Sequence, residues 1–181
     1  MKLICLKENN HLSSSIYLYI MNNVSVCKKV PRVIETQQRL RCGKHAINNL
    51  LQKRNFATCK DLNDVSKSLS QLYDIRLNEL VNPSGYYDIS VLMSFLINKK
   101  FGVKHLVSLN AKTKLNKLIG YILGDGNHWF CIRKEKSMNN LRYCYFLIDS
   151  MHKTPTKIDL KPWITNFYDN VNHSNTLILQ V

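Results

Sequence analysis

The spacing of apolar residues changes along the chain, from a helical repeat in the first half to short, strand-like runs in the second half. In the first half, apolar residues recur three or four positions apart, which predicts amphipathic helices over 42–52, 59–73 and 88–99. In the second half, short apolar runs bounded by turn residues predict strands over 103–109, 118–123, 128–133, 141–149 and 176–181. The run 118–123 also fits the end of a helix, and 162–167 fits a short helix.

Two of the strand-like runs are expected to pair as an antiparallel hairpin. The turn sequence Gly124-Asp-Gly-Asn127 leads into 128–133, and the polar loop 134–140 joins this run to 141–149. Thr58 and Asp88 stand where N-caps of the second and third helices are needed. Helices followed by an antiparallel sheet are typical of an α+β fold, with the helices packed on the sheet.

The length of 181 residues suits one domain with a sizeable core. The apolar run 16–21 falls short of the roughly 7–15 residues of a signal-peptide core, and no small-residue cleavage site follows it. We therefore interpret 1–30 as an extension or poorly ordered leader and 31–181 as the domain. No apolar run approaches the ~20 residues of a membrane span, so no transmembrane segment is expected.

The formal net charge is +14, a balance that suits nucleic acid or an anionic membrane surface. The Lys and Arg residues are scattered, however, and no recognition helix or aromatic stacking motif organises them. We therefore expect a solvated basic face and no specific nucleic-acid partner. Peripheral contact of this face with a membrane stays open.

The six cysteines stand at positions 5, 27, 42, 59, 131 and 144. Without an export signal they are expected to stay reduced and the protein to be cytoplasmic and/or nuclear, although an even number also allows a disulfide framework. No C-x-x-C pair occurs, so neither a zinc site nor any other metal or cofactor is expected.

Cys42 is expected at the first turn of the helix over 42–52, on the same face as Ala46. A thiolate is the reactive form of cysteine, and the unpaired N–H groups and positive dipole end of a helix N-terminus stabilise this anion. Gly43 leaves room for a substrate backbone to approach. The competing interpretation is that Cys42 is a small buried core residue.

His128 and Asp149 are the candidate partners of this cysteine. With the hairpin loop centred near 138–139, Asp149 lies opposite His128 within a residue or two. His128 could then act as general acid and base, with Asp149 holding the imidazole in the right tautomer. Taken singly, each residue also fits an ordinary turn position. His45 is expected to point along the helix, as a packing or supporting residue.

Gln37, five residues before Cys42, carries a side-chain amide that could donate to an oxyanion together with the backbone N–H of Cys42. Alone, a glutamine in a polar segment carries no functional meaning.

The sequence resembles the Josephin-domain deubiquitinases, a family of papain-like cysteine proteases. Four blocks carry the resemblance in the family's order, over roughly residues 33–150: Glu35-Thr-Gln37 with Cys42-Gly-Lys-His45-Ala-Ile-Asn48-Asn49-Leu50-Leu51-Gln52, Gly85-Tyr-Tyr-Asp-Ile-Ser-Val91, Asn127-His128-Trp129-Phe130-Cys-Ile-Arg133, and Leu147-Ile-Asp149-Ser150. Asp in the last block is similar to the small stand-alone members, whereas the ataxin type carries Asn there and a long tail of ubiquitin-interacting motifs.

The resemblance implies a nucleophile at Cys42, a base at His128, an orienting carboxylate at Asp149 and an oxyanion donor at Gln37. It implies hydrolysis of the (iso)peptide bond after the C-terminal Gly-Gly of ubiquitin, with ubiquitin and ubiquitinated proteins as partners of a monomeric enzyme. Substrate-binding residues are then expected in the same blocks, at Gly43, Tyr86, Tyr87, Asp88 and Trp129.

The chain departs from the family pattern at several points. Ile34 replaces the family's histidine before Glu35, and Gln38 is an alternative oxyanion donor. The segment 59–83, the family's mobile arm over the cleft, matches poorly. Because the tail of ubiquitin is basic, acidic groups such as Glu79 or Asp88 would have to face it.

Three other functions compete with the deubiquitinase interpretation. The first is another papain-like amidohydrolase that cuts a different acyl bond. The second is a catalytically silent ubiquitin-binding module, which the presence of all four catalytic residue types argues against. The third, basic nucleic-acid binding, lacks a motif.

Overall fold

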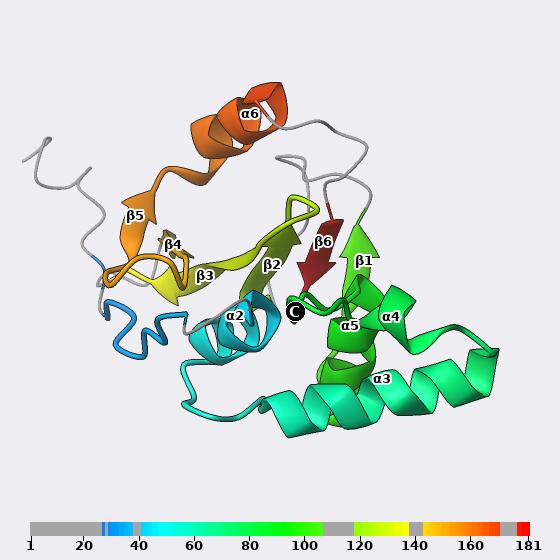
Figure 1. Cartoon of the computed structure of the whole chain (residues 1–181). Helices are drawn as coiled ribbons and strands as arrows, with labels where there is room; N and C mark the ends of the chain where they lie inside the picture. The colour runs from blue at the N-terminus through cyan, green and yellow to red at the C-terminus, as the bar shows by residue number, and fades with distance from the viewer. Residues whose placement is uncertain (1–26, 28, 38–40, 107–117, 138–142, 171–176) are drawn as a thin grey trace, which may run out of the picture.

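The computed structural model describes residues 27, 29–37, 41–106, 118–137, 143–170 and 177–181. In these ranges four helices come first, five strands follow, and one more helix and strand close the chain. The strands form one antiparallel sheet, so the predicted α+β class is confirmed. Figure 1 shows one sheet with helices on both of its faces. None of the described helices is long and apolar enough to cross a membrane.

The helices lie mostly where the apolar spacing predicts them. Their bounds are α2 Cys42–Leu51, α3 Cys59–Tyr73, α4 Leu77–Leu80, α5 Ile89–Asn98 and α6 Leu160–Asn170. Thr58 caps α3 in a capping box, because its side chain accepts from the Asp61 N–H while the Asp61 carboxylate accepts from the Thr58 N–H. Asp88 caps α5. The one-turn helix α4 was not predicted, because four residues are too few to show a period.

Six strands form one sheet in the order β1-β6-β2-β3-β4-β5, and every neighbouring pair is antiparallel. Their bounds are β1 Lys104–Leu106, β2 Gly120–Gly124, β3 Trp129–Lys136, β4 Tyr143–Ile148, β5 Thr156–Ile158 and β6 Leu177–Gln180. The run 118–123 is therefore a strand rather than a helix end. The hairpin of β3 and β4 is confirmed. The edge strand β5 was not predicted, since three residues of mixed polarity carry little pattern.

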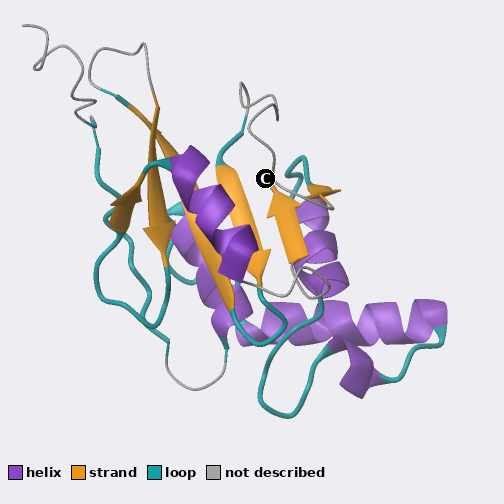
Figure 2. Ribbon diagram, turned by 90° about the horizontal axis from the view of Figure 1, so that it is seen from above, coloured by secondary structure: helices purple, strands orange, loops and turns teal. Residues whose placement is uncertain are grey.

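Apolar side chains cover both faces of the central strands. On β2, Ile122 belongs to the core shared with α2, α3 and α5, and its neighbour Leu123 belongs to the core under α6. On β3, Cys131 and Phe130 divide between the same two cores. The two views show α6 on one face of the sheet and the other helices on the opposite face (Figures 1 and 2). Because both faces are buried, these strands read as continuous apolar runs.

Cys27 and Cys144 form a disulfide, so the expectation that all cysteines stay reduced is wrong for this pair. Cys27 pairs with Ser137 just beyond the end of β3, and Cys144 lies on the neighbouring strand β4. The fold thus brings together two residues that are 117 positions apart, a separation at which no sequence spacing is informative. The thiols of Cys42, Cys59 and Cys131 are free.

Candidate active site

Cys42 is the first residue of α2, as predicted, and only 3% of its surface is exposed. The N-cap residue, Arg41, makes no side-chain capping hydrogen bond, and the first turn contains no acidic residue. No side-chain cap and no carboxylate of the first turn therefore competes for the N–H groups and the positive dipole end of α2, where Cys42 lies. At the other end of α2, the Arg133 guanidinium donates to the Leu50 carbonyl, which suits the negative end of the dipole.

His128 and Asp149 lie together at the ends of β3 and β4. The His128 Nε2 atom is 2.7 Å from Asp149 Oδ1, as the predicted hairpin requires. The strand register pairs Cys131 with Ile148, which leaves His128 and Asp149 diagonal to one another beyond the last ladder pair. Asp125 Oδ1 accepts from the His128 N–H at 2.8 Å, so the turn before β3 also fixes the backbone of the histidine.

The charges around His128 favour its protonated form. Burial alone lowers the pKa of His128, but the hydrogen bond with Asp149 and a further one with the Cys42 side chain outweigh burial and raise it to about 10. Because Asp149 occupies Nε2, the Cys42 sulfur is left with Nδ1. Burial raises the pKa of Asp149, yet hydrogen bonds from His128 and the Met151 N–H lower it overall. The imidazolium thus lies between a carboxylate and the cysteine.

Gln37 is hydrogen-bonded to Ser150, the residue that follows Asp149. Its N–H donates to the Ser150 carbonyl at 2.7 Å, and the Ser150 hydroxyl donates to Gln37 Oε1 at 3.1 Å. With Oε1 bound, the amide nitrogen of Gln37 is left to donate elsewhere. Ser150 was not predicted as a site residue, although it stands in the last quoted block. The alternative donor, Gln38, lies outside the described residues.

The polar side of α2 holds the segment that carries Gln37. Gln52 Oε1 accepts from the N–H groups of Arg32 and Val33, at 2.7 and 3.0 Å, and its amide nitrogen donates to the Val33 carbonyl. Asn49 binds the backbone of Glu35 in the same way, through one accepted and one donated hydrogen bond. Asn49 and the C-cap residue Gln52 thus bind backbone groups of this segment as a neighbouring strand would, which explains why the polar Asn49 occupies a buried position of α2.

The carboxylate of Glu35 completes this connection. It accepts from His45 Nδ1 at 2.8 Å, from Asn48 Nδ2 at 3.0 Å and from the Asn55 N–H at 2.9 Å. His45 is buried and bound to Glu35 rather than to the Cys42 sulfur, so its predicted packing and supporting position is confirmed.

Three of the five predicted substrate-binding residues are buried, and Trp129 and Gly43 are two of them. Trp129 is 0% exposed, and its indole N–H donates to the Tyr87 carbonyl at 2.9 Å. A Cβ on Gly43 would meet Leu92 at 3.1 Å and Trp129 at 3.5 Å. The missing side chain of Gly43 therefore faces the core, where it allows α2 to pack closely. A substrate contact by either residue stays a prediction.

The remaining three predicted substrate-binding residues differ in surroundings. The Tyr87 hydroxyl donates to Asn63 Oδ1 at 2.8 Å on α3, and Asp88 Oδ1 accepts from the Ser90 N–H and hydroxyl. Both side chains are therefore used within the fold. Tyr86 stacks on the buried indole of Trp129, with ring centroids 5.5 Å apart.

The acidic groups expected to face a basic peptide are also engaged. Glu79 pairs with Arg76 at 2.7 Å on the exposed surface, where such a pair contributes little to stability.

Ile34, which replaces the family's histidine, is partly buried against the core.

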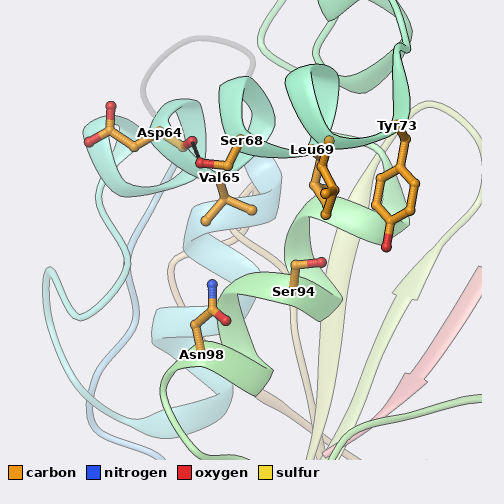
Figure 3. Close-up of a pocket in the computed structure, with 8 residues that line it drawn as sticks. Asp64, Val65, Ser68, Leu69, Tyr73, Ser94 and Asn98 are labelled. Carbon is orange, nitrogen blue, oxygen red and sulfur yellow. Dashed lines mark hydrogen bonds between the residues drawn. The ribbon is translucent and has the colours of Figure 1, made fainter.

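A groove of about 410 Å³ lies between α3 and α5, away from these residues (Figure 3). It is lined by Asp64, Val65, Ser68, Leu69, Leu72, Tyr73, Ser94 and Asn98, and contains none of the predicted site residues. Across the part of the chain that the structure describes, no three His, Cys, Asp or Glu side chains are grouped so that they could hold a metal ion.

Two comparisons relate the chain to known proteins. The model of the Josephin family matches residues 37–181. A protein named Ataxin-3 homolog, from Caenorhabditis briggsae, is 34% identical over 114 residues, which cover 55% of this chain and 35% of that protein. The chain thus spans about a third of the length of this curated relative. With four fifths of its residues matched by the family model, the chain belongs to the Josephin family.

Proposed function

We propose that this chain is a deubiquitinating cysteine protease that hydrolyses the (iso)peptide bond after the C-terminal Gly-Gly of ubiquitin. Membership of the Josephin family supports this proposal, because Josephin domains are generally deubiquitinating cysteine proteases. The observation that carries it is the position of His128, whose ring is bound by Asp149 on one side and by Cys42 on the other.

In the proposed first step, the Cys42 sulfur attacks the carbonyl carbon of the last ubiquitin residue. A C–S bond forms and the carbonyl oxygen becomes an oxyanion, which accepts hydrogen bonds from the Gln37 amide nitrogen and the Cys42 N–H. The C–N bond then breaks, and His128 gives its proton to the leaving amine nitrogen.

In the second step, water hydrolyses the thioester. His128, now neutral, accepts a proton from the water, whose oxygen attacks the same carbonyl carbon. The C–S bond breaks, which releases the ubiquitin carboxylate and restores Cys42. Asp149 holds the ring so that Nδ1 stays directed at the sulfur and stabilises the imidazolium in both steps.

The proposal is tested with ubiquitin carrying a fluorogenic amide at its C-terminus and with isopeptide-linked di-ubiquitin. We expect cleavage by the unaltered chain and none by Cys42→Ala. Cys59→Ala is the matched control, because Cys59 is likewise the first residue of a helix but α3 is capped by Thr58 and Asp61. Binding of ubiquitin without cleavage would identify a silent binding module, and absence of both would favour another amidohydrolase.

A further inference from the structure

The hydroxyl of Tyr86 is enclosed by the protein and has no hydrogen-bond partner. Within the described ranges, no other buried side-chain nitrogen or oxygen is left in this state. A buried donor without an acceptor is destabilising, and native proteins rarely keep one without a use for it. Tyr86 lies in the second of the four sequence blocks, and the mechanism above makes no use of its hydroxyl.

The ring of Tyr86 is held on an indole that also lies against Gly43, the residue after Cys42. It stacks on Trp129, with ring centroids 5.5 Å apart and planes 15° from parallel. The same indole lies 3.5 Å from the position where a side chain of Gly43 would begin, next to Cys42. Burial raises the pKa of Tyr86, and charges at Cys42 and Asp125 raise it further, so the phenol stays a neutral donor.

The backbone of Tyr86 is also fixed. Its N–H donates to Asn82 Oδ1 at 2.9 Å, and its carbonyl accepts from the Asn82 N–H at 3.0 Å. Gly85, which has φ of 89°, closes this turn in a conformation that favours glycine. The stacked ring and the fixed backbone therefore set the position of the hydroxyl, which needs only an acceptor.

A peptide that ends in Gly-Gly can bring one kind of acceptor to this position. Glycine has no side chain, so its acceptors are main-chain carbonyl oxygens, and its small size lets the peptide backbone come close to an aromatic ring. Because the hydroxyl is enclosed in the free protein, the ring has to shift slightly when the peptide binds. No existing hydrogen bond of the hydroxyl has to break for this shift.

We propose that Tyr86 is a substrate-binding residue whose hydroxyl donates to a main-chain carbonyl of the Gly-Gly segment beside Cys42. This inference rests on the proposed function and deepens it, since it assigns recognition of the glycine backbone to one side chain. It makes an uncommon combination of predictions: removal of the hydroxyl should weaken substrate use and leave the fold at least as stable.

The test compares Tyr86→Phe with the unaltered chain on fluorogenic ubiquitin. Phe keeps the stacking on Trp129 and removes only the hydroxyl. We expect kcat/KM to fall by about 3- to 10-fold, the size of one neutral hydrogen bond, mainly through a higher KM. The Tm should stay equal or rise by a few degrees, because an unsatisfied buried group is lost.

Two controls separate this role from a structural one. Tyr87→Phe removes a hydroxyl that donates to Asn63, so its Tm should fall. The rate at which iodoacetamide alkylates Cys42 should be the same in Tyr86→Phe as in the unaltered chain, because the nucleophile is untouched.

An unchanged kcat/KM in Tyr86→Phe would overturn the inference, and so would a lower Tm, which would mean that the hydroxyl has a partner in the free protein. An alkylation rate that falls as much as kcat/KM would also overturn it, because Tyr86 would then act through the thiol. If only this inference is wrong, Tyr86→Phe and the unaltered chain cleave ubiquitin equally fast. If the proposed function is wrong, the unaltered chain shows no cleavage at all.

Discussion

Gln37 and Ser150 are joined by two hydrogen bonds, one from the Gln37 N–H to the Ser150 carbonyl at 2.7 Å and one from the Ser150 hydroxyl to Gln37 Oε1 at 3.1 Å. Ser150 directly follows Asp149, which binds His128. The segment before α2 and the end of β4, 113 residues apart, therefore form one unit around Cys42. A change in either segment should affect the other.

The first prediction concerns the oxyanion donor. Gln37→Ala should lower kcat by roughly 10²–10³-fold with little change in KM, because the hydrogen bond strengthens only in the transition state. Ser150→Ala should lower kcat in the same direction by less, since it removes the group that holds Gln37 and leaves the donor in place. Steady-state cleavage of fluorogenic ubiquitin gives both parameters.

Gln38→Ala is the matched control and should be nearly silent. If Gln38→Ala lost activity and Gln37→Ala did not, the donor would be the next residue along the chain. If neither changed kcat, the oxyanion would have to be bound by backbone N–H groups alone.

The second prediction concerns pH and Asp149. The hydrogen bond with Asp149 is the largest effect that raises the pKa of His128, to about 10, so the imidazolium persists well above neutral pH. In Asp149→Ala the alkaline limb of the kcat/KM profile should move to lower pH, and kcat should fall by roughly 10²–10⁴-fold because the base loses its orientation. Asp149→Asn keeps an oxygen acceptor and should show a smaller fall in kcat.

The same pair contributes to stability with a defined sign. The pKa of His128 is raised above its ordinary 6.5, so its contribution is fully present below pH 6.5 and is lost as the pH rises through about 10. An alkaline limb that stays in place in Asp149→Ala would show that another group controls it.

The third prediction concerns acid stability and the pair of Glu35 and His45. Burial lowers the pKa of His45 despite the carboxylate, so the folded protein keeps a neutral imidazole that donates to Glu35. The unfolded chain takes up this proton near pH 6.5, so the free energy of unfolding should fall as the pH drops below that value, by up to about 1.4 kcal/mol per pH unit. Hydrogen bonds lower the pKa of Glu35 despite its burial, which adds a loss in the same direction below its ordinary 4.5.

Urea unfolding at pH 6.5, 5.5 and 4.5 measures this dependence, because the contribution of His128 still changes with pH above 6.5. His45→Gln should remove the first part of the loss, because no imidazole is left to protonate. A free energy of unfolding that stays constant from pH 6.5 to 4.5 would contradict the account. His128 does not mask the effect, since its own contribution is constant below pH 6.5.

The fourth prediction concerns the disulfide of Cys27 and Cys144. In the chain-entropy treatment, closing a loop of this size raises the free energy of the unfolded chain by about 4.7 kcal/mol. For a protein of this length this corresponds to a Tm difference on the order of 10 °C. Reduction, or Cys27→Ser, should therefore lower the Tm. Cys59→Ser is the control, and reductant should lower its Tm by as much as it lowers that of the unaltered chain. Alkylation of both Cys27 and Cys144 in the folded, unreduced protein would contradict the bond.

The sequence predicts those parts of the structure that depend on local patterns. Thr58 caps α3 through a side chain and an N–H that are three residues apart. The contact between His128 and Asp149 follows from the centre of the hairpin loop and the two-residue period of a strand. Both features are set within about 20 residues of sequence.

Features that depend on contacts across the fold could not be predicted in this way. The burial of Trp129 depends on how closely α2 packs against β3, which the sequence pattern of β3 does not contain. The attachment of Gln37 to Ser150 depends on where two distant segments end in space. The sequence does contain one signal for these contacts, because Asn49 on the buried helix α2 and its C-cap residue Gln52 are polar. Polar side chains in such positions need hydrogen-bond partners from outside the helix, and here these are backbone groups.

The central claim is that Cys42 is the nucleophile because it combines a helix N-terminus with His128. The most direct measurement uses ubiquitin with an electrophile at its C-terminus, followed by mass-spectrometric mapping of the adduct in the unaltered chain and in Cys42→Ala. Cys59 is an internal control, since it opens α3 with a free thiol but lies at a capped helix N-terminus. The account predicts one adduct, on Cys42, that disappears in Cys42→Ala; an adduct on Cys59 or Cys131, or one that persists in Cys42→Ala, would contradict it.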